Sequence, residues 1–231
     1  MVLLSSIECF SGLPVAILEQ FERTGHAANR PNDATIFAQG EPADAVYAVI
    51  GGDGQIRIGS STANSKSLMV ELLGTGEIFG EMGVIDGGVR SAEAVVIGRV
   101  QLWRIGAAVF RDVLDTTPAL GTALTRMLTR RLRRTYTLLQ DATFATVEAR
   151  LARQVLYLAG LNGQQTARGI RIPGRFRQPD LADLLGASLR SIITVLNSWR
   201  AEGLVLYDTN SARLTICRLD ALRERAEPRI G

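Results

Sequence analysis

The chain of 231 residues is 46% hydrophobic and carries a formal net charge of +3. This length allows two domains with separate hydrophobic cores, and the absence of an 18-residue apolar run or a signal-peptide pattern predicts a cytoplasmic protein without membrane contact. Cys9 and Cys217 fit no disulfide or metal spacing, and the single histidine, His26, adds no acid–base or nucleophilic arrangement. We therefore expect no enzyme, no metal and no resident cofactor.

Charge is divided unevenly along the sequence. Residues 1–117 hold 8 basic and 14 acidic side chains (−6), residues 118–146 hold 5 and 1 (+4), and residues 147–231 hold 13 and 8 (+5). The acidic first half and basic second half predict that only the C-terminal part of the chain binds a polyanion.

The first 117 residues predict one short helix followed by many short strands. Apolar residues at helical spacing after Pro14 indicate a helix over 13–22, and His26 follows in what we interpret as a loop. From Ala34 to Ile105, β-branched and alternating runs are separated by glycines, which favours a sandwich or barrel over a parallel sheet. The candidate strands are 34–38, 45–50, 54–59, 68–73, 78–80, 92–97 and 99–105.

Residues 79–92 combine a glycine and a carboxylate, Gly80 and Glu81, with an arginine and a hydroxyl, Arg90 and Ser91. Backbone N–H groups can approach a phosphate where a glycine lacks a side chain, and an arginine can donate two hydrogen bonds to its oxygens. The serine adds a donor, and the glutamate can accept from sugar hydroxyls. These residues suit a small anion carried on a sugar. The alternative is a loop salt bridge between Glu81 and Arg90.

Pro118 is predicted to end the β-rich half and to begin a long helix. A helix of about 25 residues is about 37 Å long, too long to be covered by one small β domain. Self-association along an apolar seam is the simplest way to bury it, and packing against the chain's own β domain is the alternative. The seam has steps of three or four residues and consists of Leu124, Leu128, Leu132, Thr135, Leu139 and Ala142.

The basic C-terminal part begins after a hinge expected at 141–146. Its pattern predicts a helix over 147–159 and a short strand over 169–173. A hairpin formed by 204–207 and 213–216 is predicted near the C-terminus, because a polar turn separates two apolar runs.

Between these elements, the sequence predicts a pair of short helices. The first spans 179–185 and ends at Gly186, where a left-handed backbone is favourable, and Ser188 can cap the second. Two helices joined by a glycine-containing turn form a helix-turn-helix, and the hairpin would be its wing. The buried face of the second helix is predicted to be Ile192, Val195, Leu196 and Trp199. The predicted DNA contacts are Ser188, Leu189, Arg190, Ser191, Thr194 and Arg200.

Two resemblances follow from these motifs. The 79–92 stretch resembles the phosphate-binding cassette of cyclic-nucleotide-binding domains, in which Phe-Gly-Glu precedes an apolar pair and Arg-Ser/Thr-Ala. The helix pair and wing resemble the DNA-binding domain of the Crp/Fnr transcription regulators. Together they imply an α+β fold: an N-terminal antiparallel β-roll (1–117), a dimerisation helix with a hinge (118–146) and a winged helix-turn-helix (147–231).

The resemblance also implies a set of ligand contacts. Thr135 matches the threonine that contacts the nucleotide base in the family, although an ordinary seam threonine is the alternative. The next position, a serine in the best-known cyclic-AMP receptor, is Tyr136 here, which puts base selectivity in question. The full implied set is Gly80, Glu81, Met82, Arg90, Ser91, Thr135 and Tyr136.

The second helix of the pair departs from the family pattern. Family members present an acidic residue and a later arginine to the bases, whereas this chain has Arg190 and Thr194 at those positions. Because arginine and threonine read different base edges from glutamate and arginine, the usual family half-site is not expected.

The sequence therefore predicts a homodimeric transcription regulator that binds a palindromic operator in double-stranded DNA. A cyclic nucleotide, cAMP or cGMP, would control it, and RNA polymerase would be a further partner. Two alternatives stay open. One keeps DNA binding but has another effector or none. The other is a cyclic-nucleotide-binding module that acts on a protein partner through its winged helix.

Overall fold

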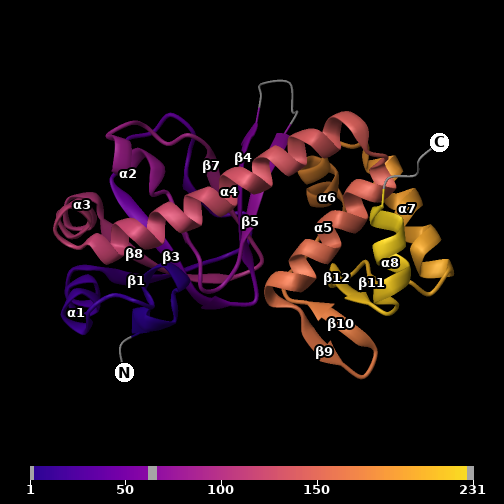
Figure 1. The fold of residues 1–231 in the computed structure, drawn as a ribbon, viewed down its shortest axis with the longest axis horizontal. Helices are drawn as coiled ribbons and strands as arrows, with labels where there is room; N and C mark the ends of the chain where they lie inside the picture. Colours follow the sequence, from indigo (N-terminus) through magenta and orange to yellow (C-terminus); the bar gives the residue numbers. More distant parts are fainter. Residues whose placement is uncertain (1–2, 62–66, 228–231) are drawn as a thin grey trace. The chain divides into compact units, whose positions relative to one another are not determined.

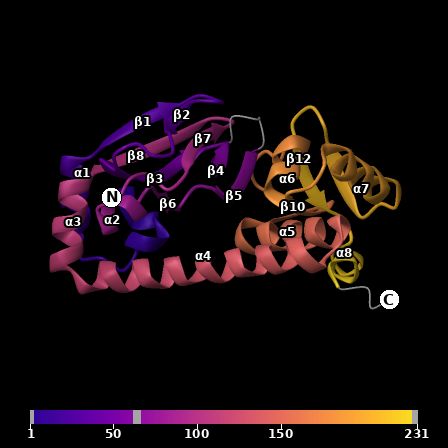
Figure 2. The ribbon, with the colours of Figure 1, turned by 90° about the horizontal axis from the view of Figure 1, so that it is seen from above.

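The computed structural model describes residues 3–61 and 67–227, and the remaining residues, 1–2, 62–66 and 228–231, lie outside the description. The chain forms two compact units, residues 1–133 and residues 134–231 (Figures 1 and 2). One long helix, α4 (Pro118–Phe144), belongs to both units, because the division falls within it.

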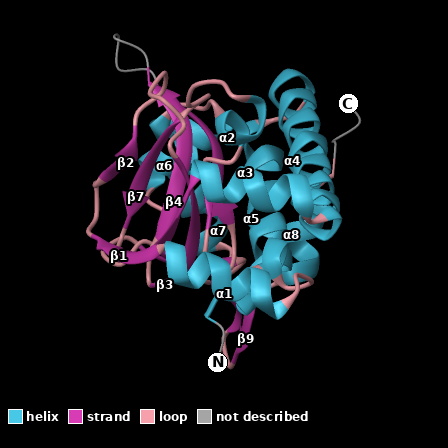
Figure 3. Cartoon of the chain, turned by 90° about the vertical axis from the view of Figure 1, so that its left-hand side faces the viewer, coloured by secondary structure: helices cyan, strands magenta, loops and turns pink. Residues whose placement is uncertain are grey.

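The first unit is built on two four-stranded antiparallel sheets, coloured magenta in Figure 3. One sheet has the strand order β1-β8-β3-β6 and the other the order β2-β7-β4-β5. This arrangement confirms the predicted antiparallel β-roll. The strands are β1 (His26–Arg30), β2 (Thr35–Phe37), β3 (Ala45–Gly52), β4 (Gln55–Ser61), β5 (Ser67–Leu73), β6 (Ile78–Phe79), β7 (Glu93–Ile97) and β8 (Val100–Gly106).

Strand β3 is apolar on both faces because it separates two hydrophobic clusters. Its Val49 packs into a cluster to which strands of both sheets contribute, so that cluster lies between the sheets. Its Val46 and Ala48 point the other way, toward helices. Alternate side chains of a strand point to opposite faces, so a strand covered on both sides needs apolar residues at successive positions.

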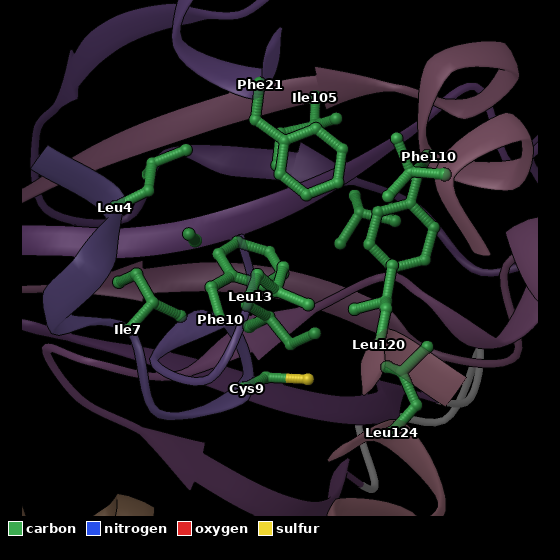
Figure 4. Close-up of a cluster of buried hydrophobic side chains, with 14 of the residues drawn as sticks. Leu4, Ile7, Cys9, Phe10, Leu13, Phe21, Ile105, Phe110, Leu120 and Leu124 are labelled. Atoms are coloured by element: carbon green, nitrogen blue, oxygen red, sulfur yellow. The ribbon is translucent and has the colours of Figure 1, made fainter. Parts of the chain in front are cut away.

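The helical cluster is drawn in Figure 4 and joins the N-terminal segment to helices α1 (Val15–Thr24) and α3 (Ala107–Thr116). The Phe21 ring contacts two other rings of this cluster, with its centroid 5.3 Å from that of Phe10 and 6.1 Å from that of Phe110. Fully burying such a side chain contributes about 1.5–3 kcal/mol. Leu120 and Leu124 belong to the same cluster, so the first turns of α4 are fixed to this unit.

The apolar seam of α4 divides into a covered part and an exposed part. Leu124 is buried in the helical cluster and Leu128 packs against it, so the beginning of the seam is covered by its own unit. Further along the helix, Leu132 is 55% exposed, Tyr136 60% and Leu139 64%. Packing against the chain's own β domain therefore accounts for the start of the seam only.

The second unit consists of five helical segments and one sheet among the described residues. Helix α5 (Val147–Asn162) is capped by Thr146, whose side chain accepts a hydrogen bond from the Ala149 N–H. Trp199 is fully buried in this unit. The sheet order is β11-β12-β10-β9. The other elements are β9 (Gln164–Thr166), β10 (Gly169–Ile172), α6 (Gln178–Leu185), α7 (Leu189–Ala201), β11 (Val205–Asp208), β12 (Arg213–Ile216) and α8 (Leu219–Ala226).

Three expectations about the elements are corrected. His26 does not lie in a loop but begins β1, where it pairs with Arg104 of β8. Pro118 does not end the β-rich half, because α3 already follows β8; the buried Ala107, Phe110 and Val113 at steps of three form its inner face. The expected hinge at 141–146 is mostly helical, because α4 runs to Phe144.

Candidate functional site

The 79–92 stretch leaves β6 through Gly80, forms the short helix α2 (Met82–Asp86) and reaches Arg90 just before β7. Gly80 has φ +76°, a left-handed conformation that residues with a side chain rarely adopt. The end of the stretch is fixed by two backbone hydrogen bonds: Arg90 N–H donates to Glu41 O at 2.8 Å, and Gly40 N–H donates to Arg90 O at 2.9 Å. The sequence therefore places Arg90 beside the Gly80 turn.

Arg90 is almost completely buried, with 2% of the residue exposed. Its Nη1 donates to Gly80 O at 2.7 Å, and its Nη2 donates to Asp44 Oδ1 at 3.0 Å. The guanidinium carbon also lies 4.1 Å from the centroid of the Phe37 ring, a distance at which a cation is attracted by an aromatic face. A guanidinium is thus held rigidly at the turn.

Asp44 connects Arg90 to a second arginine. Its other carboxylate oxygen, Oδ2, accepts a hydrogen bond from Arg104 Nη2 at 2.7 Å. Burial on its own raises the pKa of Asp44, but the hydrogen bond and charge of Arg104, together with the charge of Arg90, hold that pKa below its usual value. Asp44 is therefore a carboxylate at neutral pH and has a cation on each side.

Glu81 is also buried, with 2% exposed, and it is bound to α4 rather than to Arg90. Its Oε1 accepts a hydrogen bond from Arg131 Nη1 at 2.8 Å. Arg131 also donates to Ile78 O at 2.7 Å and forms a salt bridge with Glu71 at 3.2 Å. Burial by itself lowers the pKa of Arg131, but the surrounding carboxylates of Glu81, Glu71 and Glu77 raise it overall.

These contacts decide between the two interpretations of the stretch. The alternative of a loop salt bridge between Glu81 and Arg90 does not describe the structure, since each side chain has a different charged partner. Ser91 lies beside Met82, with Oγ 3.7 Å from the sulfur. The predicted residues of this stretch, Gly80, Glu81, Met82, Arg90 and Ser91, thus lie in one unit. Thr135 and Tyr136 belong to the part of α4 in the second unit, and their ligand contacts stay predictions.

Sequence reasoning missed two residues of this arrangement, Asp44 and Arg131. They lie 46 and 50 positions from their partners Arg90 and Glu81, so no local pattern connects them. The sequence did contain one signal for Arg131. Arg131 precedes Thr135 by four residues, or about one helical turn, and therefore lies on the same side of α4 as the predicted base contact.

Gly80 offers a test of how tightly the turn encloses Arg90. A Cβ at this position would lie 2.7 Å from Arg90 Nη1, whereas a Cβ at Gly87, which has a similar φ of +74°, would meet nothing within 4 Å. The left-handed backbone costs a non-glycine residue about 1–2 kcal/mol. We expect Gly87→Ala to lower the free energy of unfolding by about that amount and Gly80→Ala to lower it further, because Arg90 must move. Denaturant titration of both variants measures the difference, and equal losses would contradict the close approach.

The helix pair in the second unit has the predicted geometry. Gly186 is left-handed, with φ +56°, and ends α6; its N–H donates to carbonyl oxygens of the last turn. Ser188 caps α7, since its Oγ accepts a hydrogen bond from Ser191 N–H at 3.1 Å. Three residues of the predicted inner face, Ile192, Leu196 and Trp199, are buried, and Val195 is half-buried.

Helix α7 is anchored at its C-terminal end. Trp199 Nε1 donates to Glu148 Oε1 of α5 at 3.1 Å, and Arg225 of α8 donates to the same oxygen at 2.7 Å. Arg225 also donates to Glu202, just after α7, at 2.6 Å. The far end of the second helix is therefore fixed to two other helices, while its beginning is exposed. The exposed predicted contacts are Ser188, Leu189, Arg190, Thr194 and Arg200, and Ser191 is half-buried.

The described residues offer little material for catalysis. Within residues 3–61 and 67–227, no group of three or more His, Cys, Asp or Glu side chains could hold a metal ion. Burial raises the pKa of the Cys9 thiol to about 12, and the nearby Glu81 charge adds to the effect. In the same part of the chain, no helix combines the length and apolar character needed to cross a membrane.

Comparison with known proteins assigns both units. Residues 29–117 match the cyclic nucleotide-binding domain family, and residues 149–225 match the Crp-like helix-turn-helix domain family. The chain is 28% identical over 216 residues to the CRP-like cAMP-activated global transcriptional regulator of Mycobacterium tuberculosis. The matched region covers 94% of this chain and 96% of the relative.

Solved structures share the fold. FixK2 from Bradyrhizobium japonicum matches with a TM-score of 0.77 at 17% identity, covering 88% of this chain and 98% of that one. The c-di-GMP responsive global regulator CLP of Xanthomonas campestris matches with a TM-score of 0.71 at 23% identity, covering 88% and 99%.

A cyclic nucleotide-binding domain joined to a Crp-like helix-turn-helix defines a DNA-binding transcription regulator. The chain belongs to the Crp/Fnr family of such regulators. Transcription factors of this family are not enzymes, and membership of the family confirms the expectation that the chain is not an enzyme.

Proposed function

We propose that this regulator is a homodimer whose DNA binding is controlled by a cyclic nucleotide, cAMP or cGMP, bound beside the Gly80 turn. The observation that carries the proposal is the buried guanidinium of Arg90, held at the turn by Gly80 O and Asp44. In the proposed division of labour, residues 1–117 sense the ligand, 118–146 dimerise and transmit the signal, and 147–231 bind DNA.

The ligand phosphate would take the place of Asp44 beside Arg90. A phosphate accepts two parallel hydrogen bonds from an arginine, as a carboxylate does. When the phosphate binds Arg90, Asp44 keeps its second partner, Arg104, so its charge is not left without a cation. The Asp44 side chain is also 62% exposed, so the exchange leaves no buried charge without a partner.

The remaining contacts would orient the nucleoside. Glu81 accepts from Arg131 through Oε1, and a carboxylate has further lone pairs with which to accept from a ribose hydroxyl. Gly80, Met82 and Ser91 would line the phosphate side, and Thr135 with Tyr136 the base side.

The effector proposal is supported by the relative from Mycobacterium tuberculosis, whose name describes it as cAMP-activated. Another regulator of the same fold is described as c-di-GMP responsive, so a different effector is the alternative. Isothermal calorimetry of the full chain with cAMP, cGMP and c-di-GMP distinguishes them. Binding of a monomeric cyclic nucleotide supports the proposal, whereas binding of c-di-GMP alone, or of none of the three, would contradict it.

The proposed dimer would bury the exposed part of the α4 seam, which includes Leu132 and Leu139, against a second copy. A two-fold dimer presents two copies of α7, so the operator would be palindromic, with half-site centres about 10–10.5 base pairs apart or a multiple of that. RNA polymerase would be a further partner, and the cytoplasm the place of action.

Salt dependence separates DNA binding from a protein-partner role for the winged helix. Neutralising phosphates releases counterions, so the affinity for duplex DNA should fall steeply with salt, with a slope of about −0.9 for each phosphate contact. Fluorescence anisotropy with a labelled duplex at several salt concentrations measures the slope. The absence of duplex binding at low salt, with the nucleotide present, would favour the protein-partner alternative.

Arg190 and Arg200 are expected to have different roles in DNA binding. Arg190 lies at the start of α7, where base edges are read, and arginine pairs best with O6 and N7 of guanine. We expect Arg190→Ala to cost about 1–3 kcal/mol and to relax the preference at one position per half-site. Arg200→Ala should instead weaken binding to all sequences alike and reduce the salt slope by about one.

Selection from a randomised duplex pool with both variants tests this assignment. Arg223→Ala, which removes an exposed arginine of α8, provides a matched control. An unchanged selected motif with Arg190→Ala would contradict base reading by this residue.

A further inference from the structure

The hydroxyl groups at the start of α7 contribute to the helix itself. Ser188 Oγ accepts the capping hydrogen bond from Ser191 N–H at 3.1 Å and lies 2.8 Å from Ser191 Oγ, a second hydrogen bond. Thr194 Oγ1 donates to Arg190 O at 2.9 Å. These internal bonds hold the three hydroxyls against the first turn of the helix, although each hydroxyl keeps lone pairs with which to accept a further hydrogen bond.

Leu189 is the first residue of α7, and its side chain takes no part in the cap. It is 43% exposed, beside the exposed Arg190. An exposed leucine side chain makes no hydrogen bonds with water, and its transfer from water is favourable when it packs against another apolar group. The first residues of a recognition helix are those that contact base edges in the major groove.

Major-groove edges offer one apolar group, the C5-methyl of thymine. We propose that Leu189 reads a thymine through this methyl group, next to the position read by Arg190. The proposal rests on the proposed DNA-binding function and refines it: the half-site contains a thymine whose recognition depends on its methyl group and not on its hydrogen-bonding atoms.

Removal of single methyl groups from the DNA tests the proposal. With the full chain and the nucleotide present, each thymine of the selected operator is replaced by deoxyuracil, one symmetric pair at a time. Replacement at one position should weaken binding about fourfold per half-site, which corresponds to one lost buried methyl group. Replacement elsewhere in the operator should have little effect.

The variant Leu189→Ala identifies the side chain. It should bind the thymine and deoxyuracil operators with nearly equal affinity, because the contact is absent from both. Leu206→Ala, which truncates a leucine of β11 with a similar exposure of 45%, is the control and should keep the wild-type preference. Because Leu189 is exposed, its variant should unfold at the same denaturant concentration as the wild type.

A second measurement separates the methyl group from the rest of the base. At the same position, 5-methylcytosine should bind more tightly than cytosine to the wild type but not to Leu189→Ala. If the wild type binds DNA and no thymine shows a methyl dependence that Leu189→Ala removes, this proposal is wrong and the proposed function stands. If the wild type binds no DNA at all, the proposed function itself is contradicted, and this inference with it.

Discussion

Replacement of Arg90 by alanine should reduce cyclic-nucleotide affinity by about 10²-fold to 10⁴-fold. Two hydrogen bonds to a charged phosphate are lost, each contributing roughly 1.5–3 kcal/mol, and every 1.4 kcal/mol is a factor of about ten. Calorimetry measures the loss. Arg90→Lys keeps the charge without the planar fork and should give an intermediate affinity.

Arg57→Ala is the matched control for this prediction. Arg57 lies on β4 and is paired with Glu93 at 3.2 Å, so its loss also breaks a partly buried ion pair of the same unit. It should leave nucleotide affinity unchanged. Glu81→Ala should weaken binding less than Arg90→Ala, since Arg131 keeps its salt bridge to Glu71. Wild-type affinity in a folded Arg90→Ala protein would show that the ligand phosphate binds elsewhere.

The second large effect is expected at the exposed part of the α4 seam. The double variant Leu132→Asp, Leu139→Asp should raise the dimer dissociation constant roughly 10⁴-fold. Each subunit loses two leucines from the two-fold interface. Because Leu132 is 55% and Leu139 64% exposed before association, we take the lower end of the roughly 1.5–3 kcal/mol that full burial contributes, and four leucines then give about 6 kcal/mol, or about 10⁴-fold. Sedimentation should show monomers, and operator binding should be lost with the dimer.

The choice of positions follows from the structure. Leu128, although a seam residue by sequence, packs against the helical cluster of its own unit, so an aspartate there would damage folding as well as assembly. Thr137→Asp with Gln140→Asp places the same charges at exposed positions on another side of α4 and should leave the dimer intact. A Leu132→Asp, Leu139→Asp protein that still sediments as a dimer would place the interface elsewhere.

The sequence predicted those features that depend on local patterns. The short strands of the first unit, the beginning of the long helix at Pro118, the left-handed Gly186 and the Ser188 cap were recognisable, since each depends on residues close together in the chain. The cassette resemblance identified Arg90 in the same way. The antiparallel β-roll was implied by the cassette resemblance, because its sheets pair strands that lie far apart in the chain.

Features that depend on distant contacts were not recognisable. The partners of Arg90 and Glu81 come from β3 and α4 through tertiary packing, which no spacing rule reveals. The seam of α4 has one continuous pattern in the sequence, yet its beginning is covered by Phe110 and its neighbours while Leu139 is exposed. Helix α2 was missed because five residues are too few to show a helical period.

In the proposed regulator, nucleotide binding in the first unit changes the DNA affinity of the second. The most direct measurement is the affinity of the full chain for its selected operator, by fluorescence anisotropy, with and without saturating cyclic nucleotide. We expect the nucleotide to change operator affinity by about 5-fold to 150-fold, the usual range of allosteric coupling, and to have no effect on Arg90→Ala. Identical operator affinities with and without nucleotide, in a protein that binds the nucleotide by calorimetry, would contradict it.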